Sequence, residues 1–150
     1  MMSQSRSALL VIPGPPVGKA RPRFTRNGKP YTPAATAAQE QAIAWAAKDA
    51  ATGLAAQGWT LTSKAVSLTV RLYLRIPRSY PKKWRERAAA GLIWPTGKPD
   101  ADNGLKLAQD SLNRIAWEDD GQVVRATVEK RYDEQPRTEI VIEELGEKKT

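Results

Sequence analysis

The stretch from Val66 to Ile76 reads VSLTVRLYLRI, and it decides the fold because apolar residues alternate with polar or aromatic ones along its whole length. Side chains of a β-strand point to opposite faces in turn, so this alternation predicts a strand with one face in the core. The other face carries Arg71, Tyr73 and Arg75 and is expected to be exposed or partly covered. The sequence therefore predicts a sheet that is covered on one face.

Shorter patterns on either side of this strand supply further elements. Apolar runs predict strands at residues 8–12, 124–129 and 140–142, and a turn at 133–136 is expected to join the last two as an antiparallel pair. Helices are predicted from Thr32 to about Thr52, where Gly53 can end the helix, and from Arg78 to Ala90. Neither a repeat nor a linker indicates a second domain. We expect one domain over residues 1–150, with a core at about 8–145 and flexible tails at 1–7 and 146–150.

The chain of 150 residues has a formal net charge of +8 and contains neither cysteine nor histidine. Disulfides, zinc–thiolate sites and cysteine nucleophiles are thereby excluded, and catalysis without histidine must rely on carboxylates and lysine. The basic charge favours a polyanionic partner, and nucleic acid is the leading candidate because neutralising phosphates releases counterions. No apolar run reaches the roughly 18 residues of a membrane span, so we expect a cytoplasmic protein with no membrane partner.

An acidic segment interrupts this basic chain between Gly97 and Val124, which reads GKPDADNGLKLAQDSLNRIAWEDDGQVV. Clustered carboxylates repel one another unless they share a cation, and oxygen ligands suit Mg²⁺, or Mn²⁺ in its place. In an extended segment Asp100 and Asp102 would point to the same side and could reach one ion. One of the acids at 118–120 could complete the site. Taken alone, each half of the segment is also ordinary turn chemistry.

A helix is predicted inside this segment, capped by Asp102 or Asn103 and running to about Arg114. Its apolar stripe would be formed by Leu105, Ala108, Leu112 and Ile115. Lys106 shares a second stripe with Asp102 and Asp110, so its ammonium could stabilise a reacting phosphate or simply form an ion pair one turn away. Taken alone, the ion pair is the favoured interpretation.

The order and spacing of these residues resemble the RusA-type Holliday junction resolvases of bacteria and phages, the crossover junction endodeoxyribonucleases. The family's core has Asp-x-Asp-Asn, a Lys four residues after the second Asp, an Asp four residues after that Lys, and then Trp-x-Asp-Asp-x-Gln. The matching residues are Asp100 to Asn103, Lys106, Asp110 and Trp117 to Gln122. The N-terminal segment GKARPRFTRNGKPYTP also looks like many phage members, so the resemblance spans about Val11 to Ile142.

The resemblance implies an α/β fold, which with the elements above becomes a single compact α+β domain with a mixed or antiparallel sheet packed with helices. It also implies a homodimer that depends on Mg²⁺, uses no organic cofactor, and makes paired incisions at a four-way DNA junction, leaving 5′-phosphate and 3′-hydroxyl ends. The implied catalytic residues are Asp100, Asp102, Lys106 and Asp120, of which the three aspartates would hold the metal. Asp119 is the nearest competitor of Asp120.

Basic residues outside the acidic segment are the expected DNA contacts. They are Lys19, Arg21, Arg23, Arg26 and Lys29 in an exposed N-terminal arm, Arg71 and Arg75 in the strand, and Lys82 and Lys83 in the helix that follows. Phe24 or Tyr31 could wedge against an opened base pair, although burial in the core is the favoured interpretation for both.

Two alternatives stay open from sequence. The first is a nuclease of the PD-(D/E)xK type built on Pro99-Asp100, but the candidate Lys130 lacks an acid two places earlier. The second is a non-catalytic, architectural DNA-binding protein in which the acidic segment is only a capped helix and a loop.

Overall fold

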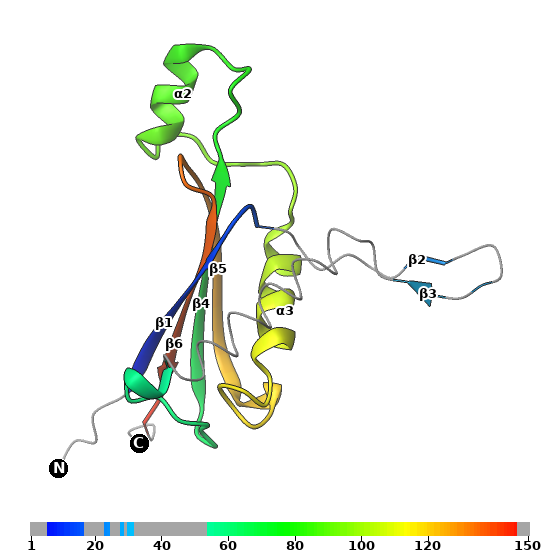
Figure 1. The fold of residues 1–150 in the computed structure, drawn as a ribbon, viewed down its shortest axis with the longest axis vertical. Coiled ribbons are helices and arrows are strands. Elements are labelled where there is room, and N and C mark those ends of the chain that lie inside the picture. The colour runs from blue at the N-terminus through cyan, green and yellow to red at the C-terminus, as the bar shows by residue number, and fades with distance from the viewer. Residues whose placement is uncertain (1–5, 17–22, 25–27, 29, 32–53, 147–150) are drawn as a thin grey trace.

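The computed structural model describes residues 6–16, 23–24, 28, 30–31 and 54–146, and the account below is confined to them. The elements, coloured along the chain in Figure 1, are β1 (Ser7–Pro13), β2 (Arg23–Phe24), β3 (Pro30–Tyr31), β4 (Val66–Arg75), α2 (Lys82–Ala89), α3 (Ala101–Leu112), the 3-10 helix η1 (Asp120–Gln122), β5 (Val123–Asp133) and β6 (Arg137–Glu144).

Four strands form one mixed sheet in the order β1-β6-β4-β5. Strand β6 runs antiparallel to both β1 and β4, whereas β4 and β5 run parallel. Parallel neighbours need a crossover connection, and here the crossover contains α2 and α3. The expectation of a single compact α+β domain is therefore confirmed, with a mixed sheet. The short strands β2 and β3 pair separately as an antiparallel ribbon.

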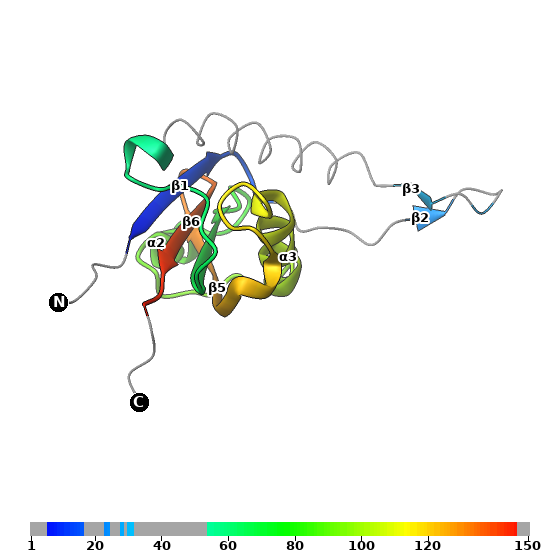
Figure 2. The same ribbon diagram turned by 90° about the horizontal axis from the view of Figure 1, so that it is seen from below.

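The predicted strand at Val66–Ile76 is confirmed as β4, which lies inside the sheet. Its apolar side chains Val66, Leu68, Val70 and Leu72 are at most 2% exposed. Helix α3 covers this face of the sheet by packing on β4 and β5, as the end-on view in Figure 2 shows. Leu107, Ala108 and Leu112 of α3 complete the core from the helix side.

The predicted antiparallel pairing of residues 124–129 with 140–142 is wrong. Strands β5 and β6 are joined by a short turn at residues 134–136, but β4 lies between them and pairs with both. The connection therefore crosses β4 near its end, where Arg137 of β6 stacks its guanidinium 3.9 Å from the ring centre of Tyr73. In a simple hairpin β5 would pair directly with β6. Here β4, a long buried strand from earlier in the chain, lies between them.

Helix α3 begins earlier than predicted, with Asp100 rather than Asp102 or Asn103 at its N-cap. Asp100 has an extended backbone, and its carbonyl accepts the first helical hydrogen bond from Gly104 at 3.1 Å. Because the helix also ends at Leu112, Ile115 falls outside the buried stripe and is 36% exposed. Leu107, which the predicted stripe lacked, is buried in its place.

Other boundaries differ less. Helix α2 lies within the predicted range 78–90, and Trp84 anchors it by stacking on Tyr80 and meeting Tyr132 of β5 edge-on. The predicted tail at 1–7 is too long, because Ser7 begins β1 and Arg6 is bonded to the end of β6. The helix predicted over 32–52 lies outside the described residues, although residues 54–56 just beyond it are helical. Among the described residues, no helix is long and apolar enough to cross a membrane.

Candidate functional site

The N-terminus of α3 lies at the carboxyl end of the parallel strands β4 and β5, toward the end of the sheet where α2 is found (Figure 1). Lys130 of β5 fixes the segment that leads into the helix, because its ammonium donates to the carbonyl oxygens of Gly97 at 2.6 Å and Pro99 at 3.1 Å. Lys130 is the lysine that the PD-(D/E)xK alternative would need. It is engaged by backbone carbonyls, so it positions the loop before Asp100.

Asp100 and Asp102 stand together at this helix end. Asp100 is half-exposed and its two carboxylate oxygens lie 3.0 and 2.9 Å from the ammonium of Lys98. Asp102 is exposed, lies in the first turn, and has no ion pair or hydrogen bond within the part of the chain that the structure describes. The prediction of an extended Asp100–Asp102 segment is wrong, because Asp102 is helical. The partial positive charge of a helix N-terminus nevertheless favours two carboxylates there.

Lys106 lies one turn beyond Asp102 on α3. Its ammonium is 3.7 Å from the carboxylate of Asp110, and the Lys106 side chain is 66% exposed. An exposed pair at this spacing contributes only a few tenths of a kcal/mol, so it does not fix the lysine firmly. Lys106 therefore stays available to a charged group placed at the helix N-terminus.

Asp120 lies at the other end of the molecule. Helix α3 has 12 residues and separates it from Asp102, and at 1.5 Å per residue the helix alone is about 18 Å long. Figure 1 shows the loop after α3 at the end of the sheet opposite α2. Within the described ranges no three acidic side chains are grouped so that they could hold one ion. The predicted metal set of Asp100, Asp102 and Asp120 is thus not assembled in one chain.

The motif from Trp117 to Gln122 has a structural role that sequence reasoning missed. Trp117 is fully buried, and its indole N–H donates to Asp120 at 2.9 Å, which fixes the orientation of that carboxylate. Asp119 caps η1 by accepting from the backbone N–H of Gly121 at 2.9 Å. Asp119 and Asp120 therefore each use one carboxylate oxygen in a hydrogen bond, and which of them is the third metal ligand stays open.

Gln122 attaches this loop to the segment before β4. Its amide nitrogen donates to the carbonyl oxygens of Thr62 and Lys64, both at 2.8 Å, while its amide oxygen accepts from the backbone of Asp119. These bonds hold the start of β5 beside the start of β4. The sequence has Trp117 and Gln122 on either side of the acidic pair, but only the fold shows that these two side chains hold the loop in place.

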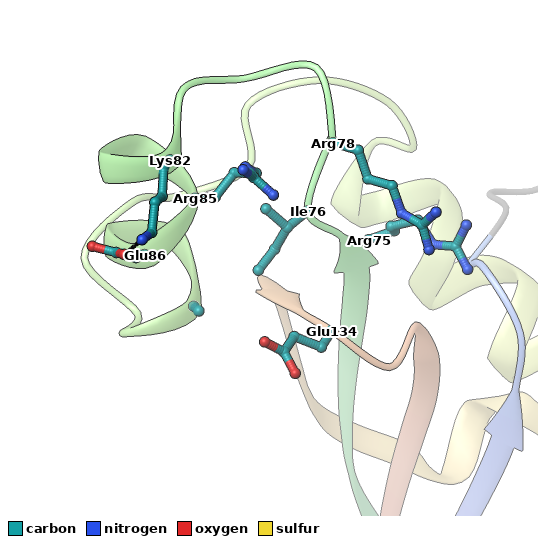
Figure 3. A pocket seen from close by; sticks show the side chains of 8 residues that line it. Arg75, Ile76, Arg78, Lys82, Arg85, Glu86 and Glu134 are labelled. Atoms are coloured by element: carbon teal, nitrogen blue, oxygen red, sulfur yellow. Dashed lines mark ion pairs between the residues drawn. The ribbon is translucent and has the colours of Figure 1, made fainter.

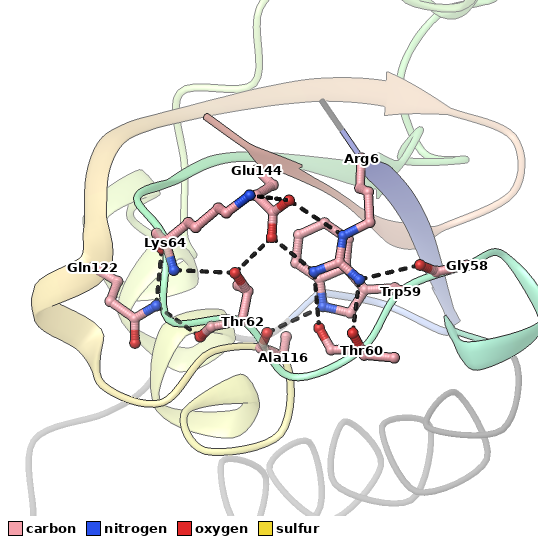
Figure 4. A network of polar contacts seen from close by, with 9 residues as sticks. All are labelled: Arg6, Gly58, Trp59, Thr60, Thr62, Lys64, Ala116, Gln122 and Glu144. Atoms are coloured by element: carbon pink, nitrogen blue, oxygen red, sulfur yellow. Dashed lines mark hydrogen bonds and ion pairs between the residues drawn. The ribbon is translucent and has the colours of Figure 1, made fainter. Parts of the chain in front are cut away.

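A second polar network, shown in Figure 4, joins the two chain-terminal strands to the same loop. Glu144 of β6 is 7% exposed and accepts from Arg6 at 2.7 Å and from the hydroxyl of Thr62 at 2.6 Å. Arg6 also lies 5.1 Å from the ring centre of Trp59. The bonds from Arg6, followed by that from Thr62, lower the pKa of Glu144 from 4.5 to about 2. The network stabilises the fold and lies away from the α3 N-terminus.

The predicted DNA-binding residues separate into three groups. Lys19, Arg21, Arg26 and Lys29 lie outside the described residues, and Arg23 is placed only as part of β2, as Phe24 and Tyr31 are in β2 and β3. Arg71 lies on the face of β4 away from α3, in register with Glu129 and Glu139 on the neighbouring strands. Arg75 and Lys82 line one cavity of about 500 Å³, whereas Lys83 does not.

Comparison with known proteins places the chain in a family. The model of the family described as endodeoxyribonuclease RusA matches residues 13–143, which is most of the chain. A curated relative from Bacillus subtilis (strain 168), named uncharacterized protein YqaN, is 39% identical over 138 residues, covering 89% of this chain and 93% of the relative. The match includes β4, β5, all of β6 except Glu144, and both halves of the acidic segment, whereas of β1 it reaches only Pro13. The chain belongs to the RusA family of endodeoxyribonucleases.

Proposed function

We propose that this protein is a metal-dependent endonuclease that resolves Holliday junctions and related branched DNA by paired phosphodiester hydrolysis. The observation that carries the proposal is the exposed pair Asp100 and Asp102 at the N-terminus of α3, in a chain of an endodeoxyribonuclease family. Carboxylates, a nearby lysine and a basic surface suffice for such a reaction, and the chain has no histidine to perform it otherwise.

The donor set fits a hard divalent cation such as Mg²⁺ in part. Asp100 and Asp102 would hold it, and a bound ion would polarise the scissile phosphate and lower the pKa of an attacking water. Lys106 is close enough along the helix to offset negative charge that develops on the phosphate. Lys98 now neutralises Asp100, and because its side chain is 83% exposed, its ammonium can leave without disturbing the core.

A third carboxylate has to come from elsewhere, since α3, which is about 18 Å long, lies between Asp120 and this pair. The proposal is that Asp120 of one protomer meets Asp100 and Asp102 of its partner in a twofold homodimer. Twofold symmetry would then create two equivalent sites, as cleavage of two symmetric strands requires. A monomer would bind DNA without cutting it.

The test is Asp102→Asn, assayed on a labelled synthetic four-way junction, a linear duplex and a single strand, with Mg²⁺ or EDTA. Wild type should cut the junction in Mg²⁺ alone, and the variant should bind the junction but cut it at least about 100-fold more slowly, the scale of a lost catalytic group. Glu143→Gln removes an exposed acid from β6, outside the candidate site, and serves as the matched control.

Three results would contradict the proposal. Undiminished cutting by the Asp102 variant would refute the assignment of the site. Cutting of linear duplex as fast as of the junction would refute the preference for junctions. Binding by wild type without any cleavage in Mg²⁺ or Mn²⁺ would favour the non-catalytic, architectural alternative.

A further inference from the structure

A cavity of about 500 Å³ lies between the end of β4 and one face of α2 (Figure 3). Helix α2 contributes Lys82, Arg85, Glu86 and Ala89, whose spacing of three and four residues places them on one helix face. Strand β4 contributes its last residue, Arg75, the segment after it contributes Ile76 and Arg78, and the turn after β5 contributes Glu134. Three separate parts of the chain thus converge on it.

The lining is rich in cations that the described part of the chain does not neutralise. Four basic residues face two acidic ones, and one of these acids, Glu86, is already 3.9 Å from Lys82 in an exposed ion pair. Arg75 and Arg78 have neither an ion pair nor a hydrogen bond among the described residues. Figure 3 shows both guanidinium groups directed to the same side of the strand, away from Glu86 and Glu134.

Like charges that converge without a counter-charge repel one another, and an anion between them removes that repulsion. Guanidinium groups present a planar set of N–H donors that matches the oxygens of a phosphate. Arg85 lies on the α2 side, across Ile76 from this pair, and its Nε donates to the carbonyl of Tyr80 at 3.1 Å. The pair of Arg75 and Arg78 at the edge of the cavity therefore has the chemistry of a phosphate site.

We propose that Arg75 and Arg78, at the edge of this cavity, bind a phosphodiester group of the DNA backbone, apart from the phosphate that is cut. The inference rests on the proposed function for the identity of the ligand, and it adds Arg78 to the contacts that the sequence indicates. The cavity lies toward the same end of the sheet as Asp100, so one DNA arm can meet both.

The experiment compares two double variants of the full-length protein. Arg75→Ala with Arg78→Ala removes the cavity cations, and Arg87→Ala with Arg125→Ala removes two exposed arginines that do not line it. Binding of a fluorescent four-way junction is measured in EDTA over a series of salt concentrations, after thermal unfolding has shown that both variants fold.

The cavity variant should bind about tenfold or more weakly at moderate salt, and the slope of log K against log [salt] should become shallower by about one, the value for one lost phosphate contact. The control variant should stay within about twofold of wild type, because its arginines face other directions. Glu134→Gln should tighten binding, since it removes a negative charge from the cavity wall.

Equal losses in the two double variants would overturn the inference, because they would indicate diffuse attraction to the whole basic surface. An unchanged salt slope in the cavity variant would overturn it as well. Because binding is measured without metal, this outcome is separate from the proposed function. A protein that binds as expected but never cuts would refute the nuclease and keep the phosphate site.

Discussion

At the scale of single residues, the bond between Arg6 and Glu144 joins positions that are 138 apart in the chain. The Arg6 guanidinium donates to both carboxylate oxygens of Glu144, at 3.2 and 2.7 Å, and the hydroxyl of Thr62 donates to the same carboxylate at 2.6 Å. Neither Arg6 nor Glu144 belongs to a sequence motif, and the two meet because β1 and β6 become neighbours in the sheet.

The buried carboxylate of Glu144 predicts a dependence of stability on pH. Its pKa in the folded protein is about 2, below the 4.5 of the free group, so the folded state favours the charged form. The resulting stability is fully present above about pH 5 and is lost as the pH falls through 4.5 toward 2. A shift of this size corresponds to about 3 kcal/mol at 1.36 kcal/mol per unit.

We therefore expect Glu144→Gln to lower the free energy of unfolding by about 2–3 kcal/mol at pH 7 and by roughly half as much at pH 3. Urea unfolding of wild type and variant at both pH values measures this difference. Glu143→Gln, on the neighbouring exposed position, is the control. An equal loss at both pH values would show that packing rather than charge explains the effect.

At the scale of elements, the period-two pattern of β4 was sufficient because α3 buries one face of that strand and leaves the other polar. The same kind of pattern located β5 and β6 but not the strands they pair with. Alternation shows which side chains share a face of the sheet, and it does not show which strand lies alongside. The start of α3 was misplaced for a related reason. Asp100, Asp102 and Asn103 all have capping side chains, and the packing of Gly104 against Leu72 sets the helix position.

Gly104 of α3 lies close against Leu72 of β4, and this predicts the result of adding a methyl group. A Cβ at Gly104 would lie 2.6 Å from a methyl carbon of Leu72, which is only 2% exposed and has little room to move. Replacing Gly by Ala inside a helix gains about 1 kcal/mol, but overpacking a core costs about 1–3 kcal/mol. Gly104→Ala should therefore lower stability by about 1 kcal/mol.

A double-mutant cycle makes this test specific. In a Leu72→Ala background the clash is absent, so Gly104→Ala should now raise the free energy of unfolding by up to about 1 kcal/mol. The change of sign between the two backgrounds, measured by urea unfolding, is the expected result. Stabilisation in both backgrounds would mean that α3 lies farther from β4 than the structure has it.

At the scale of the whole molecule, the sequence placed the two acidic groups in the right elements but not at the right distance from each other. Both belong to one short segment, which suggested a single site, yet α3 extends between them and places them at opposite ends of the sheet. A linear motif does not report the direction in which a helix runs. The separation is what makes a second protomer necessary in the proposed reaction.

Subunit mixing tests this division of the site directly. Homodimers of Asp102→Asn or of Asp120→Asn should both be inactive, because every site lacks one carboxylate. In a mixed dimer one site carries both substitutions and the other carries neither, so co-refolding the two variants should restore about a quarter of the wild-type sites. Such dimers have one working site each, and they should nick the junction rather than resolve it.

The control mixture combines Asp102→Asn with Asp100→Asn, two substitutions in the same half of the site. Every mixed dimer then has one lost carboxylate in each site, so no activity should return if the halves come from different protomers. Repeating the first mixture with Asp119→Asn in place of Asp120→Asn identifies the third carboxylate. Only the variant of the essential aspartate should be inactive as a homodimer and regain activity when it is mixed with Asp102→Asn. If the first mixture stays as inactive as the control although mixed dimers form, all three carboxylates act within one chain and α3 must move for catalysis.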